Sequence, residues 1–167
     1  VGELITYQLT LTVPEGVTPG AILVDNLGAG LAYVGPVTLT NSDTAHVSLS
    51  GTPADPAVSS AGGTVTFSFG DIADTDVNDA TAETITLTYP VVVLNVGGNT
   101  PGTRLHNTAG LSWTGGTGAG ASAPDTQLVQ PQVTVVKSAN PGSGDAGDQI
   151  TFSISVTNTS LATGTDA

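Results

Sequence analysis

The sequence predicts an all-β protein, an immunoglobulin-like antiparallel β-sandwich made of many short strands. Threonine and valine are abundant, and 22 glycines with 10 prolines supply turns. Apolar and polar residues alternate along residues 3–13, so that Ile5, Tyr7 and Leu9 share one face. Strands with one buried face, separated by frequent turns, are typical of sandwiches.

The same alternation predicts further strands between turn signals. Pro14-Glu15-Gly16 and Pro19-Gly20 predict turns after the first strand. Pro90 is expected at a strand edge or a bulge, because proline cannot donate a ladder hydrogen bond. The tract from Gly115 to Ala123 is expected to be a flexible loop. The expected strands cover residues 3–13, 21–25, 31–34, 37–40, 46–50, 64–69, 83–96, 104–113, 126–129 and 132–136.

Composition excludes several classes of partner. The 167 residues contain 14 acids and 2 bases, a net charge of −12. Nucleic acid is excluded because phosphate contacts need clusters of Lys and Arg. No apolar run approaches the ~20 residues of a membrane span, so no membrane insertion is expected in this segment. The absence of cysteine excludes disulfides.

An internal repeat indicates tandem organisation. Residues 147–157 align with residues 2–12, and every position matches in type except Gln149 against Leu4. The offset between Gly2 and Gly147 is 145 residues, about one domain. Tandem domains usually serve length, spacing and display. We expect a boundary near residues 130–132 and an excerpt of a longer chain.

Several segments resemble a known repeat family, the domain of unknown function DUF11. Residues 136–152 are similar to its opening, K-x-x-x-P-x-x-x-x-x-G-D-x-[IV]-T-[YF], and residues 156–159 to the V-T-N-T that follows. Residues 23–31 are similar to its V-x-D-x-L-P-x-G-L, with Gly28 replacing the usual proline. Residues 70–72 and 105–109 resemble its G-[DT]-[IV] and L-x-N-x-A segments.

The resemblance implies an immunoglobulin-like sandwich in large secreted or surface proteins of bacteria. It places a first repeat, without its first strand, in residues 1–130 and the start of a second repeat in residues 131–167. A sandwich that lacks a strand has an open edge and an apolar groove, which another strand can fill. We expect neighbouring repeats or copies of the chain as partners, with residues 132–136 as the donated strand.

The resemblance also points to a covalent cross-link. In related pilin-like surface domains, a first-strand lysine joins a last-strand asparagine through an isopeptide bond, helped by a buried carboxylate. Asn107 and Asp25 occupy plausible partner positions in the first repeat. Lys137 would normally serve the second repeat, so a bond from Lys137 to Asn107 could form only if the tail strand replaces the missing first strand. The reaction needs a neutral amine held against the amide. The alternative is an exposed lysine at a strand end.

An acidic loop is a candidate calcium site. Alternating Asp side chains and loop carbonyls can supply the six to eight oxygens that Ca²⁺ prefers. The loop is not an EF-hand, because Asp79 stands where glycine is required and Ile85 where the bidentate Glu belongs. The alternative is a solvated turn. The candidate ligands are Asp71, Asp74, Asp76, Asp79 and Glu83.

These features predict an extracellular structural or adhesive module of a bacterial surface protein or filament, and not an enzyme. The alternative is an adhesin module that binds calcium or carbohydrate. For the carbohydrate alternative, Trp113 and Tyr89 are the aromatic residues that could line a sugar site, although both are also candidates for the core.

Overall fold

The computed structural model describes residues 1–77, 80–129 and 133–158. The chain divides into two compact units. The first contains residues 1–99 and 103–127, and the second contains residues 100–102 and the chain from Leu128 onward. Every regular element in the described ranges is a β-strand, and all strand pairs are antiparallel. The described residues include no helix that could span a membrane.

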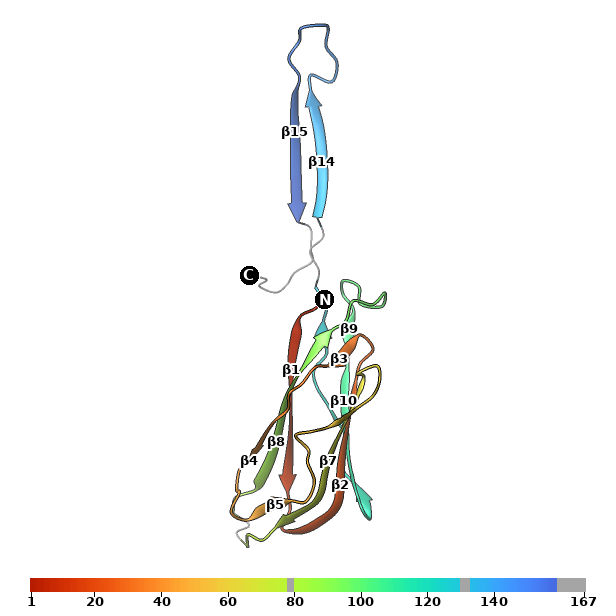
Figure 1. Ribbon diagram of the computed structural model, residues 1–167. Helices are drawn as coiled ribbons and strands as arrows, with labels where there is room; N and C mark the ends of the chain where they lie inside the picture. The colour runs from red at the N-terminus through yellow and green to blue at the C-terminus, as the bar shows by residue number, and fades with distance from the viewer. Residues whose placement is uncertain (78–79, 130–132, 159–167) are drawn as a thin grey trace. The chain divides into compact units, whose positions relative to one another are not determined.

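The first unit contains two main sheets, which confirms the predicted antiparallel sandwich (Figure 1). In the smaller sheet, β8 is central, with β1 on one side and both β3 and β4 on the other. In the larger sheet, β2 lies between β7 and β10. The smaller sheet consists of β1 (Leu4–Val13), β8 (Glu83–Val93), β3 (Leu31–Tyr33) and β4 (Thr38–Asn41).

Shorter strands complete the larger sheet. β11 and β12 pair with β10, while β5 and β6 pair with β7. A separate two-stranded ladder joins β9 to β13. The remaining strands are β2 (Gly16–Leu27), β7 (Thr64–Asp74), β10 (Asn107–Trp113), β5 (Val47–Leu49), β6 (Ala57–Val58), β11 (Gly116–Thr117), β12 (Ala121–Ser122), β9 (Arg104–Leu105) and β13 (Thr126–Gln127).

The core lies between the two sheets, as the alternation predicts. Side chains of β8 alternate between buried and less buried positions along its whole length, and those of β7 do so on both sides of an interruption at Gly70 and Asp71. An aromatic cluster occupies the middle, where the ring centroids of Phe67 and Tyr89 are 5.2 Å apart. Tyr7 and Tyr33 contact the same Tyr89 ring from β1 and β3. Residues with no solvent exposure include Val65, Phe67, Phe69, Ile85, Leu87, Tyr89 and Val91.

The turn expected at Pro19-Gly20 is instead a bulge within a long strand. β2 continues from Gly16 to Leu27, and its register against β7 shifts on both sides of Ala21. Gly20 adopts a positive φ of 60°, which glycine tolerates without steric cost. Its N–H donates to Asp71 Oδ1 at 2.9 Å, so a side chain replaces the lost ladder bond.

The expected flexible loop at 115–123 contains two short strands. β11 folds back on β10 through a tight turn, with Trp113 opposite Gly116. A Cβ on Gly116 would lie 2.9 Å from the Trp113 ring, so the missing side chain makes room for the indole. β12 then pairs with Thr108 and Ala109. Glycine here permits close packing as well as turning.

Pro90 lies within the central strand β8 and not at its end. On one side it is opposite Thr6 of β1. On the other side it falls between β3, which pairs with residues 91–93, and β4, which pairs with residues 85–88. Its missing N–H therefore coincides with a break between two partner strands, where no ladder bond is lost.

The second unit contains one described hairpin. β14 (Val133–Asn140) pairs with β15 (Thr151–Asn158) over eight residue pairs, from Val133 opposite Asn158 to Asn140 opposite Thr151. All of its residues are exposed, including Val135 (64%) and Ile154 (65%). The predicted boundary at 130–132 lies outside the described residues, so the division into repeats stays a prediction.

Candidate functional site

An open groove runs along β1 on the side away from β8. In the described part of the chain, β1 pairs with β8 alone, so its other edge has no strand partner. The opposite wall is formed by β10 and the segment 118–123. The groove combines two adjoining cavities that share Leu9, Thr10, Ala109 and Ala121. We call this feature the β1–β10 groove.

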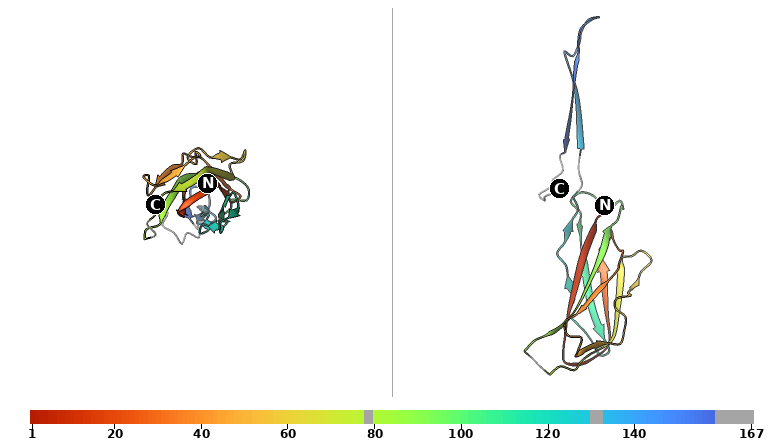
Figure 2. Two further views of the ribbon diagram at one scale, coloured as in Figure 1. Left: turned by 90° about the horizontal axis from the view of Figure 1, so that it is seen from below. Right: turned by 60° about the vertical axis from the view of Figure 1, so that its left-hand side comes forward.

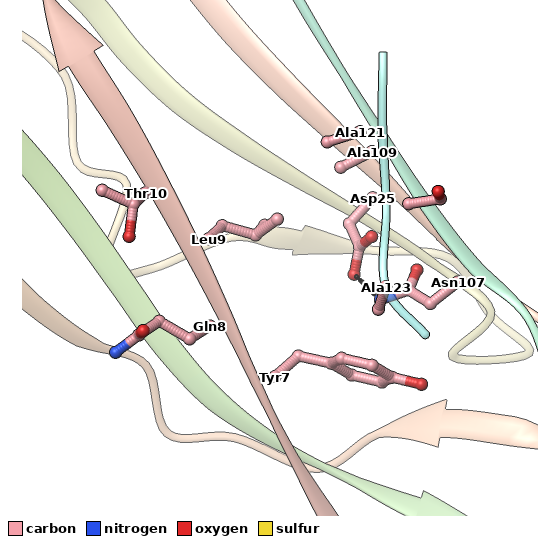
Figure 3. Close-up of a pocket in the computed structure, with 10 residues that line it drawn as sticks. Tyr7, Gln8, Leu9, Thr10, Asp25, Asn107, Ala109, Ala121 and Ala123 are labelled. Carbon is pink, nitrogen blue, oxygen red and sulfur yellow. Dashed lines mark hydrogen bonds between the residues drawn. The ribbon is translucent and has the colours of Figure 1, made fainter. Parts of the chain in front are cut away.

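The two parts of the groove differ in chemistry. One part, of about 430 Å³, is lined by apolar side chains that include Leu11, Leu23 and Leu111. The other, of about 160 Å³, contains Tyr7, Asp25 and Asn107. Figure 3 shows Tyr7 and Leu9 pointing toward this polar part, while Gln8 and Thr10 point away from it. The apolar part suits aliphatic side chains, and the polar part suits a hydrogen-bonding group.

Asp25 is a fully buried carboxyl at the polar end of the groove. It lies on β2 at a position where the strand faces inward, and its exposed fraction is 0%. The Tyr89 hydroxyl donates a hydrogen bond to its Oδ2 from β8. Asn107 Nδ2 on β10 donates to the same oxygen at 3.3 Å. The structure thus brings together Asp25 and Asn107, two of the three residues expected to form the cross-link.

Two acceptors at this site have no partner. Among the described residues, Asp25 Oδ1 and Asn107 Oδ1 are both buried and accept no hydrogen bond. An unpaired buried acceptor costs about 1–3 kcal/mol. Two of them in one cavity indicate a binding position for a group with several N–H donors. The side chain with three donors and no acceptor is the lysine ammonium.

Burial sets the protonation of this cluster. Removal from water raises the pKa of Asp25 above its ordinary value of 3.8, although the hydrogen bonds from Tyr89 and Asn107 oppose that rise. Burial also raises the pKa of Tyr89, and the contact with Asp25 raises it further. Asp25 therefore holds a proton at pH values where an exposed aspartic acid has lost it.

This shift predicts a pH dependence of stability. Because the folded chain binds the Asp25 proton more tightly than the unfolded chain, the resulting stabilisation is complete below pH 3.8 and is lost as pH rises through the higher folded pKa. Urea unfolding at a series of pH values should show this decline. Asp25→Asn, which keeps the shape, should remove it. An equal decline in the variant would contradict the assignment.

The candidate calcium ligands are distributed over β7, β8 and the segment between them. Asp71 Oδ1 accepts a hydrogen bond from the Gly20 N–H at the β2 bulge. Asp74 Oδ1 accepts one from the Asp76 N–H at 2.9 Å. Glu83, at the start of β8, is buried with 7% exposure. Asp79 lies outside the described residues. Three of the candidates are therefore strand residues, since Asp71 and Asp74 lie in β7 and Glu83 begins β8.

A different set of ligand atoms is close together. Carboxylate oxygens of Asp43 and Asp76 and a ring nitrogen of His46 lie within 4.8 Å of one another. His46 Nδ1 is 2.7 Å from Asp43 Oδ2, and this contact raises the pKa of His46 and lowers that of Asp43. One nitrogen and two carboxylates suit Zn²⁺ better than Ca²⁺. The sequence pattern missed Asp43 and His46 because they precede the acidic loop by some thirty residues.

We expect Asp71 to act through its hydrogen bond and not through a metal. Asp71→Ala should lower the free energy of unfolding by about 0.5–1.5 kcal/mol, equally in EDTA and in millimolar Ca²⁺, because it removes the acceptor for Gly20. Asp55→Ala, at an exposed position, is the control. A calcium-dependent stabilisation that Asp71→Ala abolishes would instead support the calcium site.

Lys137 lies on β14 in the second unit. Its Nζ is 4.7 Å from the centroid of the Phe152 ring on β15, a cation–π contact. It is the only lysine in the sequence.

The two aromatic residues considered for a sugar site differ in exposure. Tyr89 is fully buried, so its ring cannot stack against a sugar, and Trp113 on β10 is half-buried.

Comparisons with known proteins found similarity only among solved structures. No family model matches the chain, and no curated protein matches it. The chain is similar to the pilus backbone RrgB from Streptococcus pneumoniae, at 23% identity and a TM-score of 0.44, over 68% of this chain and 25% of that one. It is also similar to domains D2 and D3 of the major pilin SpaD from Corynebacterium diphtheriae, at 18% identity and a TM-score of 0.47, over 88% of this chain and 53% of that one. A third structure is BcpA, the major pilin subunit of Bacillus cereus, at 14% identity and a TM-score of 0.47, over 95% of this chain and 50% of that one. The chain thus spans between a quarter and about half of these structures.

Proposed function

We propose that this chain is a structural module of an extracellular bacterial repeat protein or filament. The main support is the domain-length internal repeat, whose second copy forms a strand, β15, of the same kind as β1. Single modules in such arrays contact their neighbours and provide length. The strong negative charge keeps an exposed array soluble.

Surface labelling tests this location directly. We expect antibodies raised against residues 1–127 to label intact cells of the source organism without permeabilisation. An antibody against a cytoplasmic protein serves as the control, because it should label only permeabilised cells. Labelling of the module only after permeabilisation would contradict an extracellular role.

We further propose that Asn107 is the acceptor of an isopeptide bond to Lys137, with Asp25 as the catalytic residue. Support comes from the contact between Asp25 Oδ2 and Asn107 Nδ2, which is the nitrogen that must leave. A buried carboxyl with a raised pKa retains a proton that it can donate to a leaving group.

The reaction is balanced without an external reagent. The neutral Nζ of Lys137 attacks Cγ of Asn107, and a new C–N bond forms. The bond from Cγ to Nδ2 breaks while Asp25 protonates the departing nitrogen. Asp25 then regains a proton from the attacking amine, so that one ammonia leaves and the carboxyl is unchanged. Holding the two groups together in a dry site supplies the rate advantage.

Intact mass under denaturing conditions tests this bond. We expect each link to lower the summed mass by one ammonia, and we expect Asn107→Ala, Lys137→Arg and Asp25→Ala each to abolish that loss. Asn95→Ala, at an exposed position, is the matched control and should retain it. A chain with no loss of ammonia after prolonged incubation would refute the cross-link.

The alternative function is a binding module for a divalent cation or a carbohydrate. The observation that bears on it is the group formed by Asp43, His46 and Asp76. Calorimetric titration with Zn²⁺ and with Ca²⁺ separates a metal-binding module from a passive one, and a glycan array separates a lectin from a stalk. Metal uptake that His46→Ala and Asp76→Ala both abolish would favour the alternative.

A further inference from the structure

The second unit contains a counterpart of β1 that already has a partner strand. At the 145-residue offset, β15 corresponds to residues 6–13. Phe152 stands at the position of Tyr7, Ile154 at that of Leu9, and the side-chain types agree through Thr157. β15 is held by β14. The pairing of β14 with β15 therefore shows which strand fits the edge of β1.

The groove edge of β1 has backbone groups available for such a strand. The Val93 N–H donates to the Glu3 carbonyl at 2.9 Å, so odd-numbered residues of β1 direct their backbone groups toward β8. Even-numbered residues such as Gln8 and Thr10 direct theirs away from β8. A strand added there would complete its ladder with these residues.

The register of the hairpin can be transferred to β1. In the hairpin, Lys137 is opposite Ile154, and Val135 is opposite Val156. At the same offset, Lys137 falls opposite Leu9. Val135 falls opposite Leu11 by the same transfer. Directly opposite residues share a face of the sheet, so both side chains would point into the groove.

This register matches the chemistry of the groove along its length. Val135 would lie over the apolar part, beside Leu11 and Leu23. Lys137 would lie over the polar part, where Leu9 adjoins Asp25 and Asn107. Its ammonium would donate to both unpaired oxygens, and its positive charge would favour the ionised form of the buried carboxyl. A register shifted by one residue would turn both side chains to the outer face.

The same chain cannot supply its own β14 in this register. An antiparallel strand must place Val133 opposite Val13, at the end of the first unit where β2 begins. Gln127 lies at the other end, because β13 pairs with β9 near the end of β2 (Figures 1 and 2). β2 spans roughly 35 Å at about 3.3 Å per residue. The six residues from Gln127 to Val133 reach about 20 Å at most.

We infer that the β1–β10 groove binds strand β14 of a second copy of this chain, with Lys137 opposite Leu9 and its ammonium on Asp25 and Asn107. The inference deepens the proposed function and rests on it. β14 would use the edge that now binds β15, and an isolated two-stranded hairpin is only marginally stable, so the exchange costs little. Each copy donates a strand and accepts another, a heterologous contact that extends into open chains unless the copies close a ring.

Native mass spectrometry and light scattering on the full chain test this inference. We expect dimers and longer species that grow with concentration. Val135→Asp should weaken self-association by at least about tenfold, because it places a charge in the apolar part of the groove. Val136→Asp is the matched control, since Val136 is equally exposed (64%) and faces the other side of β14. It should leave assembly unchanged.

A peptide covering residues 133–140 provides a second measurement that does not depend on exchange of the hairpin. It should bind the monomeric Val135→Asp chain, and the same peptide with positions 136 and 137 interchanged should bind at least about tenfold more weakly. Equal binding of the two peptides, or equal effects of the two Asp substitutions, would overturn the register.

A chain that stays monomeric at millimolar concentration would overturn the second copy as the occupant, even if the peptide binds. The covalent proposal fails separately. If the chain assembles without losing ammonia, the isopeptide bond is refuted and the donated strand is supported. If a single chain loses ammonia without assembling, the donated strand from a second copy is refuted and the isopeptide bond is supported.

Discussion

Phe67→Ala should lower the free energy of unfolding by about 3–5 kcal/mol. Phe67 is fully buried between the two sheets and packs 5.2 Å from the centroid of Tyr89. Its truncation would remove apolar contacts and leave a cavity at the centre of the aromatic cluster. Urea unfolding followed by tryptophan fluorescence would measure the change, because Trp113 is the only tryptophan and belongs to the first unit.

A control for this substitution lies on β2. Val17→Ala, at a position 64% exposed, also truncates an apolar strand residue but opens no cavity, so its effect should stay within about 0.5 kcal/mol. Equal effects of the two substitutions would mean that the sheets do not enclose the core described above.

Tyr89→Phe should cost about 0.5–1.5 kcal/mol through the loss of a single hydrogen bond, because Asn107 still donates to the same oxygen of Asp25. The ring and its packing are kept, but Asp25 loses a donor to Oδ2 while remaining buried. Because that hydrogen bond lowers the pKa of Asp25, its removal should also raise this pKa further. The decline of stability with pH should then begin at the same pH but extend to higher pH and become larger, which urea unfolding at several pH values would detect.

Tyr33→Phe is the matched control for the hydroxyl. Tyr33 contacts the Tyr89 ring at a centroid distance of 6.0 Å but is not a donor to Asp25. Its substitution should leave the pH dependence in place. If Tyr89→Phe is neutral while Asp25→Asn is destabilising, the hydroxyl contributes nothing to the carboxyl site.

Alternation along the sequence predicted β1, the first part of β7 and most of β8, but only residues 21–25 of β2, and residues 71–74 of β7 were expected to belong to an acidic loop. Residues 3–13, 64–69 and the first part of 83–96 each show a two-residue period, and each contributes a buried face. The bulge at Pro19-Gly20 could not be predicted in this way, because it depends on Asp71, a residue 51 positions away along the chain. The strands within 115–123 likewise depend on β10 as a template.

The candidate site was only partly within reach of the sequence. Asp25 and Asn107 came from a family resemblance, but their contact spans 82 positions and depends on the register of β2 against β10. Tyr89 was identified as an inward-facing residue, while its hydrogen bond to Asp25 depends on how the two sheets face each other. Alternation gives the face of a strand on which a residue lies and not its partner across the core.

Pro90 has a consequence for how such modules can aggregate. The side of β8 opposite β1 is bordered by two short strands with an interruption at the proline, and so offers no long continuous edge to an incoming chain. The ten-residue β1 does offer one. Strand addition to this sheet is therefore expected at the β1 edge and not at the β3/β4 edge. Amyloid-like stacking, in which strands add at both edges of a sheet, is disfavoured for the same reason.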